Sequence, residues 1–206
     1  MKLEKIWAVY FSGTGTTRRT VERIAGGIAS RLNLPAESVD FSRPAVRQET
    51  LGFGEKDLVV FGTPVYAGRV PNVLLPFLRE RIVGGGALAV PVVLFGNRNY
   101  DDALIELRNI LAADGMHPIA AGAFVGEHSF SRVLGADRPN AEDEALMDEF
   151  AARVAELAAG LDAAPVKSVA VRGQEPLRPY YTPRDRAGNP INILKVKPKT
   201  DLSRCG

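Results

Sequence analysis

Apolar residues along this chain gather in short continuous runs that are separated by longer amphipathic segments. The runs are rich in β-branched and aromatic residues and carry no charge, and they span residues 6–11, 58–61, 88–95 and 119–125. Continuous runs of this length are typical of strands buried on both faces, as in a parallel sheet covered by helices. A weaker strand is expected at 38–41.

Apolar residues in the intervening segments recur with helical periodicity. The segments that show it are 17–32, 72–81, 102–113 and 141–161. In the first, the apolar side chains from Val21 to Leu32 fall on one stripe, and Asp101 or Asp102 can cap the third. Strands that alternate with helices predict an α/β doubly wound sheet with helices on both faces. Right-handed crossovers then place every strand-to-helix loop at the carboxyl edge, where ligands bind.

The composition changes after about residue 164. Six prolines occur from Pro165 to Pro198, and long apolar runs are scarce. We therefore expect one domain over 1–164 and a Pro-rich, extended tail over 165–206. The net charge of +2 hides a difference, because residues 1–165 carry 17 basic and 21 acidic side chains (net −4), whereas residues 166–206 carry 9 and 3 (net +6).

Overall composition narrows the class of protein. Of 206 residues, 46% are apolar and 24% charged, as in ordinary soluble globular proteins. There is no apolar stretch long enough to span a membrane and no secretory leader, so we expect a cytoplasmic location. The small net charge argues against nucleic acid as a partner. A lone Cys205 forms no internal disulfide or metal site, and the acidic residues 142–144 are ordinary at a helix start, so no metal site is expected.

The loop after the first strand carries the clearest chemical signal. Residues 11–17 read Phe-Ser-Gly-Thr-Gly-Thr-Thr and lead directly into the first helix. Glycines allow close approach of the backbone, hydroxyls donate hydrogen bonds, and the helix start adds unpaired N–H groups. This combination predicts a site for a phosphate monoester, with a turn that only caps the helix as the alternative. The loop is not a Walker phosphate loop, because no Gly-Lys-Ser/Thr follows. It is a poor dinucleotide-binding fingerprint as well, because Arg18 stands where the third glycine belongs.

Three loops together resemble those of the flavodoxins. Residues 12–17 are similar to the flavodoxin phosphate loop, and loops 62–71 and 96–102 are similar to those that flank the isoalloxazine ring of FMN in that family. The resemblance covers about residues 3–160. It implies FMN as the cofactor and a flavodoxin-like, five-stranded parallel sheet in the order 2-1-3-4-5. The cofactor-binding residues that it implies are Ser12, Gly13, Thr14, Gly15, Thr16 and Thr17 for the phosphate, and Thr63, Pro64, Val65, Tyr66, Ala67, Gly68, Gly96, Asn97, Arg98, Asn99, Tyr100 and Asp101 around the ring.

The resemblance also implies separate roles within this site. Tyr66 and Tyr100 each offer a flat ring face to the flavin, although either one alone reads equally well as an ordinary loop tyrosine. The peptide between Ala67 and Gly68 is implied to present a carbonyl to flavin N5, because glycine adopts positive φ without strain. A tight turn with no further role is the alternative.

Three further side chains near these loops need an interpretation. Flavodoxins usually surround FMN with acidic or neutral groups, so an inward-pointing Arg69 or Arg98 would favour the anionic reduced form. We expect both to be solvated surface arginines. His128 is expected to be a satisfied loop histidine, with proton relay or partner docking as the alternative, whereas His117 lies at the wrong end of its strand for chemistry.

The end of the chain is similar to the connector of flavodoxin–ferredoxin fusion proteins. In those proteins a Lys-Thr-Asp-x-x-x-Cys run opens a ferredoxin domain, and here the run 199–205 stops at its first cysteine. A [4Fe-4S] cluster needs four thiolates, so one copy of this sequence holds none. The sequence leaves open whether a ferredoxin half was lost or belongs to a longer chain.

The resemblance implies an FMN-binding electron carrier, rather than a stand-alone enzyme, that exchanges electrons with a ferredoxin or another iron–sulfur partner. No catalytic residue is assigned. The alternatives are an FMN-dependent NAD(P)H:quinone-type reductase and a non-redox module that binds another phosphorylated ligand. The basic tail either packs against its own domain or attracts an acidic partner. We expect truncation after Pro165 to leave FMN binding intact while slowing electron transfer.

Overall fold

The computed structural model describes residues 1–131, 133–192 and 203, and its centre is one parallel sheet. The strands of the sheet are β1 (Lys5–Tyr10), β2 (Ala36–Asp40), β4 (Asp57–Pro64), β6 (Leu88–Phe95), β7 (His117–Pro118) and β8 (Gly122–Val125). They lie in the order β2-β1-β4-β6-β7, and β8 also pairs with β6. Counting β7 and β8 as one interrupted strand, this is the predicted order 2-1-3-4-5, and the α/β doubly wound fold is confirmed.

The fifth predicted strand, 119–125, is wrong in its extent. Its ladder with β6 pairs Ala89 with Pro118 and then Val92 with Gly122, so β6 advances three residues while its partner advances four. An extra residue in one strand is accommodated as a bulge, which interrupts the ladder. A run of apolar residues carries no sign of such an interruption.

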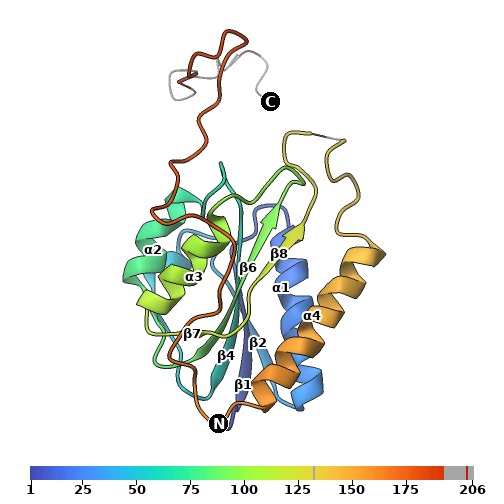
Figure 1. The fold of residues 1–206 in the computed structure, drawn as a ribbon, viewed down its shortest axis with the longest axis vertical. Helices are drawn as coiled ribbons and strands as arrows, with labels where there is room; N and C mark the ends of the chain where they lie inside the picture. The colour runs from blue at the N-terminus through green and yellow to red at the C-terminus, as the bar shows by residue number, and fades with distance from the viewer. Residues whose placement is uncertain (132, 193–202, 204–206) are drawn as a thin grey trace.

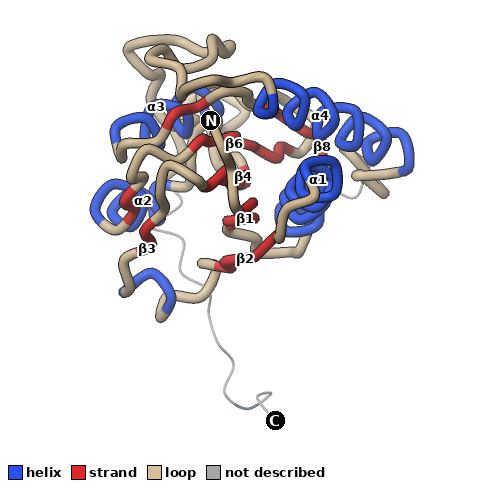
Figure 2. The backbone as a smooth tube through the Cα atoms, turned by 90° about the horizontal axis from the view of Figure 1, so that it is seen from below, coloured by secondary structure: helices blue, strands red, loops and turns tan. Residues whose placement is uncertain are grey.

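Helices cover both faces of the sheet, as Figure 1 shows from the side and Figure 2 from below. The α-helices of the described residues are α1 (Thr16–Leu32), α2 (Leu75–Glu80), α3 (Ala103–Ala113) and α4 (Ala141–Ala159), with 3-10 turns η1 (Val46–Gln48) and η2 (Asn72–Leu74). Helices α1 and α4 lie on one face, and α2 and α3 on the other. Strands β3 (Leu51–Gly52) and β5 (Ile82–Val83) form a separate parallel pair.

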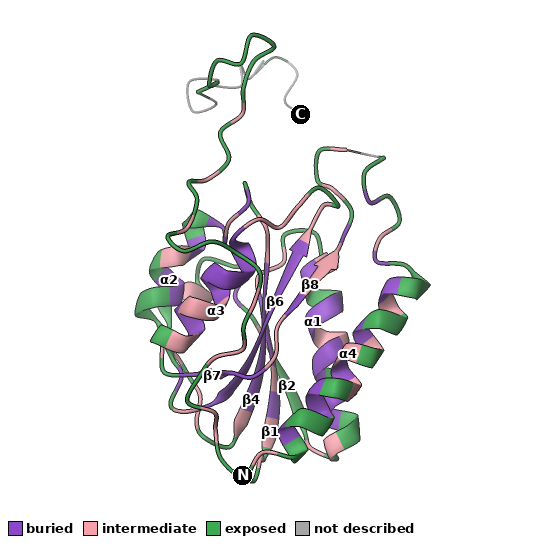
Figure 3. Ribbon diagram, in the orientation of Figure 1, coloured by how far each residue is buried: buried purple, intermediate pink, exposed green. Residues whose placement is uncertain are grey.

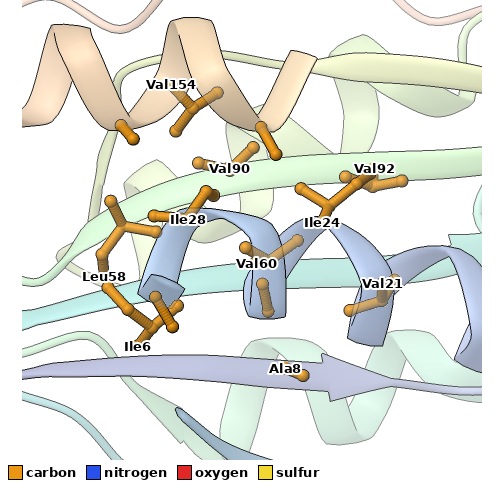
Figure 4. Close-up of a cluster of buried hydrophobic side chains, with 14 of the residues drawn as sticks. Ile6, Ala8, Val21, Ile24, Ile28, Leu58, Val60, Val90, Val92 and Val154 are labelled. Carbon is orange, nitrogen blue, oxygen red and sulfur yellow. The ribbon is translucent and has the colours of Figure 1, made fainter. Parts of the chain in front are cut away.

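Two apolar clusters hold these layers together, and the central strands are buried on both sides (Figure 3). On the face covered by α1 and α4, Ile24, Ile28 and Val154 pack against Ile6 and Val60 of the sheet (Figure 4). The other cluster contains a stack of three phenylalanines, Phe41, Phe61 and Phe77, with ring centroids 5.3 and 5.1 Å apart. Burial of such residues supplies most of the folding free energy.

The tail packs along α3 as far as residue 181 and then leaves the domain (Figure 1). The main-chain N–H of Val169 donates to the carbonyl of Pro118 (2.9 Å), and the guanidinium of Arg108 donates to the carbonyl of Val169 (3.1 Å). Further on, Gly173 lies against Ile105 of α3. Packing against its own domain, one of the two alternatives for the tail, therefore holds for this part of it.

Candidate functional site

The loops that follow β1, β4, β6 and β8 meet at the carboxyl edge of the sheet (Figure 1). We call residues 11–17 the first loop, 62–71 the second loop and 96–102 the third loop. The first loop touches two of the others. An ideal Cβ on Gly13 would lie 3.8 Å from the hydroxyl of Tyr66, and one on Gly126, just after β8, would lie 2.9 Å from the methyl group of Thr16.

The first loop leads into α1, and the N-cap residue of this helix, a glycine, has no side chain to cap it. Gly15 occupies the N-cap position with φ 87°, a left-handed conformation that glycine adopts freely. The Ser12 hydroxyl accepts the N–H of Arg18 (3.1 Å), and the hydroxyls of Thr14 and Thr16 lie 3.4 Å apart. Thr14 and Gly15 are exposed, so the helix start presents N–H groups and hydroxyls outward.

A glycine in β4 sets the position of this helix start. A Cβ on Gly62 would fall well inside the van der Waals radius of Val21 and 3.2 Å from the methyl group of Thr17. Thr17 is itself buried against the strand, unlike the exposed Thr14. Only a residue without a side chain lets the first turn of α1 lie this close to the sheet.

The base of the second loop is buried. The Thr63 side chain is fully buried, and its hydroxyl has no hydrogen-bond partner among the described residues. Thr63 therefore supports the loop from below and offers no surface to a ligand. Pro64 and Val65 are half-buried, and the Val65 N–H donates to the carbonyl of Leu94 (2.8 Å).

The tip of the second loop is a two-residue turn. The N–H groups of Tyr66 and Arg69 each donate to the other's carbonyl, at 2.9 and 3.1 Å. Between them, Ala67 and Gly68 both have positive φ, 51° and 80°, as in the type I′ turns of hairpins. The side chain of Tyr66 is 43% exposed and reaches Gly13 of the first loop.

The third loop holds its tyrosine against the core. The ring of Tyr100 packs edge-on against Phe95, with centroids 5.4 Å apart, and is half-buried over the α2/α3 cluster. Asn97 and Asp101 have positive φ, 58° and 44°, so the backbone of this loop is as unusual as that of the second. Left-handed conformations of non-glycine residues cluster at functional sites.

Side chains of the third loop fix it to itself and to the second loop. Arg98 forms an ion pair with Asp101, and the side-chain oxygen of Asn99 accepts the Asp101 N–H (3.0 Å). The Asp101 carboxylate lies against Gly68, where a Cβ would come within 2.6 Å of its oxygen. The structure therefore brings together the three regions that the sequence singled out.

The interpretation of Arg69 as a solvated surface arginine is wrong. Its side chain is only 12% exposed, and it forms two hydrogen bonds of 2.7 Å to the fully buried carboxylate of Glu106 in α3. These bonds raise the pKa of the guanidinium above its ordinary value. Arg98 is half-exposed as expected, and its guanidinium lies 5.5 Å from the ring centroid of Tyr181 in the tail. Neither arginine is an unpaired cation.

The expected capping role of Asp102 is also wrong. Asp102 occupies the N-cap of α3, but its carboxylate makes no bond to the helix. It accepts instead from the N–H groups of Gln174 (3.0 Å) and Arg178 (2.8 Å) and from the Arg178 guanidinium. Those bonds from Arg178 lower the pKa of Asp102 to about 2. The Asp102 carboxylate therefore binds the tail, although the local sequence predicts that it caps the helix.

The loop after β8 closes the far side of this edge. The ring of His128 packs against Gly96 of the third loop, and its Nδ1 lies 3.1 Å from the N–H of Phe130. This agrees with the satisfied loop histidine that the sequence favours. His117 is at the opposite end of the sheet, with Nδ1 3.1 Å from the carbonyl of Pro165.

Sequence reasoning missed the contribution of the tail to this site. A shallow hollow, partly open to solvent, lies between the second loop, the third loop and the tail. Its lining residues are Ala67, Gly68, Arg69, Arg98, Asp101, Arg178, Pro179 and Tyr181. The available signal was the pair Asp102 and Glu106, two carboxylates one turn apart on a face of α3 that is otherwise apolar. Buried carboxylates require partners, and these partners came from elsewhere in the chain.

Neither a metal site nor a membrane-spanning helix is found in the described part of the chain. No group of three or more His, Cys, Asp or Glu side chains in residues 1–131, 133–192 and 203 is arranged to hold a metal ion. Cys205 and the run 199–205 lie outside these residues. No helix among them is both long and apolar enough to cross a membrane.

Comparison with known proteins agrees with this architecture. The model of the family described as "Flavodoxin domain" matches residues 8–126, more than half of the chain. A flavodoxin from the domain Archaea is 18% identical with a TM-score of 0.53, and the alignment covers 74% of this chain and 96% of that one. A short-chain flavodoxin associated with a non-canonical PDU bacterial microcompartment is 16% identical with a TM-score of 0.53, over 77% of this chain and 99% of that one. No curated protein matches.

At these low sequence identities, the similarity to solved structures shows only that the fold is shared. The family model adds the sequence pattern, and its match includes the first, second and third loops. The chain therefore belongs to the flavodoxin family, whose cofactor is FMN.

Proposed function

We propose that this chain is an FMN-dependent electron carrier that exchanges electrons with a ferredoxin or another iron–sulfur protein. The observation that carries the proposal is the first loop, where a helix start with glycine at its N-cap and the exposed Thr14 beside it lies close to Tyr66 of the second loop. An anion cradle next to an aromatic side chain matches a ligand with a phosphate at one end and a flat ring at the other.

The residues present fit FMN at both ends. Thr14, Gly15 and Thr16 would hold the phosphate, together with the hydroxyls of Ser12 and Thr17 and the N–H groups at the start of α1. No side chain of the loop competes for that helix start apart from Ser12, which accepts only from Arg18. Bound phosphate would therefore satisfy groups that the fold leaves open.

The ring end would lie between the second and third loops. Tyr100 is held in place by Phe95, and Tyr66 is placed beside Gly13, so two aromatic faces are available on separate loops. When bound, FMN supplies the transfer of electrons one or two at a time. The chain supplies a neutral local charge, because Arg69 is offset by Glu106 and Arg98 by Asp101.

Binding of FMN is tested by titration of the purified full chain, followed by flavin fluorescence and the visible spectrum. Thr14→Asp places a negative charge in the exposed cradle, so the Kd for FMN should rise about 100-fold, as expected for like charges a few ångströms apart. Thr50→Asp, an equally exposed threonine before β3, is the matched control and should leave the Kd within about twofold. Absence of FMN binding by the unmodified chain would refute the proposal.

The iron–sulfur partner is the finer part of the proposal. It is supported by the resemblance to flavodoxin–ferredoxin fusion proteins and by the charge difference between residues 1–165 and 166–206, −4 against +6. Arg184 and Arg186 are exposed beyond the domain, where a basic surface would attract an acidic carrier. The division at residue 164 and a cytoplasmic location stay predictions from the sequence.

Electron exchange with reduced ferredoxin, measured by stopped flow, tests this part. The rate should fall as ionic strength rises, because attraction between unlike charges is screened. Steady NAD(P)H-to-quinone turnover without any partner would instead favour the reductase alternative. Retention of a phosphorylated ligand that lacks a flavin band would favour the non-redox alternative.

A further inference from the structure

The part of the tail that packs on the domain, residues 166–181, ends at the second loop, and we call it the tail strap. It follows α3 from Val169 to Gly173 and reaches Ala67 at its far end. The last residues of the tail strap therefore lie beside the same loops that form the candidate FMN site. Its attachment there consists of a buried carboxylate and a polar network.

The first attachment is a buried carboxylate. Asp102 is fully buried and accepts two main-chain N–H groups of the tail strap, from Gln174 and Arg178. It also forms an ion pair with the Arg178 guanidinium, whose Nε lies 2.9 Å away. Both carboxylate oxygens are thus committed to the tail strap, and removal of the tail strap would leave a buried charge without these partners.

The second attachment joins the tail strap to the second loop. The Arg69 guanidinium, already bound to Glu106, also donates to the carbonyl of Arg178. It lies 4.8 Å from the ring centroid of Tyr180, and the Tyr180 hydroxyl donates to the carbonyl of Val70 (2.7 Å). Helix α3, the second loop and the tail strap therefore share one polar network.

The network ends at the turn formed by Ala67 and Gly68. The N–H of Tyr181 donates to the carbonyl of Ala67 (2.9 Å), and the N–H of Asp102 donates to the carbonyl of Gly68 (3.0 Å). Ala67 has φ 51°, a left-handed conformation that a non-glycine residue rarely adopts. Such a conformation persists only where surrounding contacts hold it.

We infer that the tail strap positions the Ala67–Gly68 turn for the cofactor, with the main-chain N–H of Tyr181 as the positioning group and the Asp102–Arg178 pair as its anchor. The inference rests on the proposed FMN function and goes beyond it. It assigns to the tail a role in cofactor binding, and it replaces the expectation that a chain ending at Pro165 would bind FMN unchanged.

Two variants of Tyr181 separate the positioning group from its side chain. Tyr181→Pro removes the N–H that bonds Ala67, whereas Tyr181→Ala keeps that N–H and removes only the ring. Tyr181 is 58% exposed, so neither variant should compromise folding. Both variants lose the ring, which lies 5.5 Å from the Arg98 guanidinium, so the comparison between them isolates the N–H. Loss of one hydrogen bond corresponds to about a fivefold change in affinity, so the Kd for FMN should be about fivefold higher for Tyr181→Pro than for Tyr181→Ala, and the midpoint potential of bound FMN should differ between the two variants.

The anchor is tested in the full chain before FMN is added. Arg178→Ala should speed amide exchange at Tyr181 at least tenfold, because the end of the tail strap is released from Asp102. Arg172→Ala is the matched control, since Arg172 is exposed and has no hydrogen bond or ion pair recorded within the described part of the chain. It should leave that exchange rate unchanged.

The outcomes distinguish this inference from the function on which it rests. If the unmodified chain binds no FMN, the proposed function is wrong, and the inference falls with it. If FMN binds but Tyr181→Pro and Tyr181→Ala have the same Kd and the same potential, only the inference is wrong. Unchanged exchange at Tyr181 in Arg178→Ala would overturn the anchor in the same way.

Discussion

The two ends of helix α3 place an aspartate in opposite settings. At the start, Asp102 is fully buried, accepts four hydrogen bonds from the tail and has its pKa lowered to about 2 by Arg178. At the other end, Asp114 has a buried carboxylate oxygen with no partner among the described residues, and burial raises its pKa to about 6.

The difference between these ends follows the difference between the two edges of the sheet. The start of α3 faces the carboxyl edge, where Asp102 and Glu106 hold the tail and the second loop. The end of α3 faces the opposite edge, where a negative charge also opposes the helix dipole. Buried charge at the first end is paired and holds the tail against the second loop, whereas buried charge at the second end is unpaired and costs stability.

The strongest test of this comparison removes the ion-pair partner of a buried carboxylate near the start of α3. Arg69→Ala leaves the carboxylate of Glu106 buried and unpaired, so the free energy of unfolding should fall by about 3–5 kcal/mol. Urea unfolding of the full chain measures this. Arg153→Ala breaks an exposed pair with Glu149 and should change stability by less than about 0.5 kcal/mol. Equal effects of the two variants would show that Arg69 acts as a surface residue.

A smaller effect of known sign is expected for Asp102→Asn. Because the pKa of Asp102 is about 2 in the folded protein and ordinarily 3.8, its charged form stabilises the fold above pH 4, and this stability is lost as the pH falls towards 2. The variant should lose about 1–2 kcal/mol at pH 7, a value reduced for the exposure of Arg178. The difference in unfolding free energy between the variant and the unmodified chain should be smaller at pH 3 than at pH 7. An equal difference at both pH values would contradict this role of the Asp102 charge.

Local sequence patterns were sufficient to predict the fold and to single out the first, second and third loops. The apolar run 88–95 is β6 itself, and the stripe over 17–32 is α1 to within one residue. The first loop is local too, because its glycines, hydroxyls and helix start are consecutive. Each of these features depends on neighbours in the chain.

The contacts that local patterns miss join residues far apart in sequence. Arg178 lies 76 positions from Asp102, and Arg69 lies 37 from Glu106, so no spacing rule relates them. The local sequence indicated only that Arg69 is an exposed loop arginine. The bulge between β7 and β8 was not predicted for a similar reason, since it depends on the pairing of these strands with β6.

The smallest expected effect lies at the other end of α3. Because the folded pKa of Asp114 is about 6, above its ordinary 3.8, the group stabilises the fold most below pH 4, and this contribution is lost as the pH rises through 6. Asp114→Asn should therefore be more stable than the unmodified chain by about 1 kcal/mol at pH 8, after allowance for partial exposure, and gain nothing at pH 4.

Unfolding at the two pH values measures this gain, and Arg79→Ala separates its causes. The nearby positive charge of Arg79 opposes the effect of burial on Asp114, so its removal should raise the pKa of Asp114 further. Salt should mimic that variant, since it screens Arg79 but leaves the burial unchanged. A stability gain for Asp114→Asn that is equal at both pH values would mean that the carboxylate is not desolvated. The contrast between the ends of α3 would then rest on Asp102 alone.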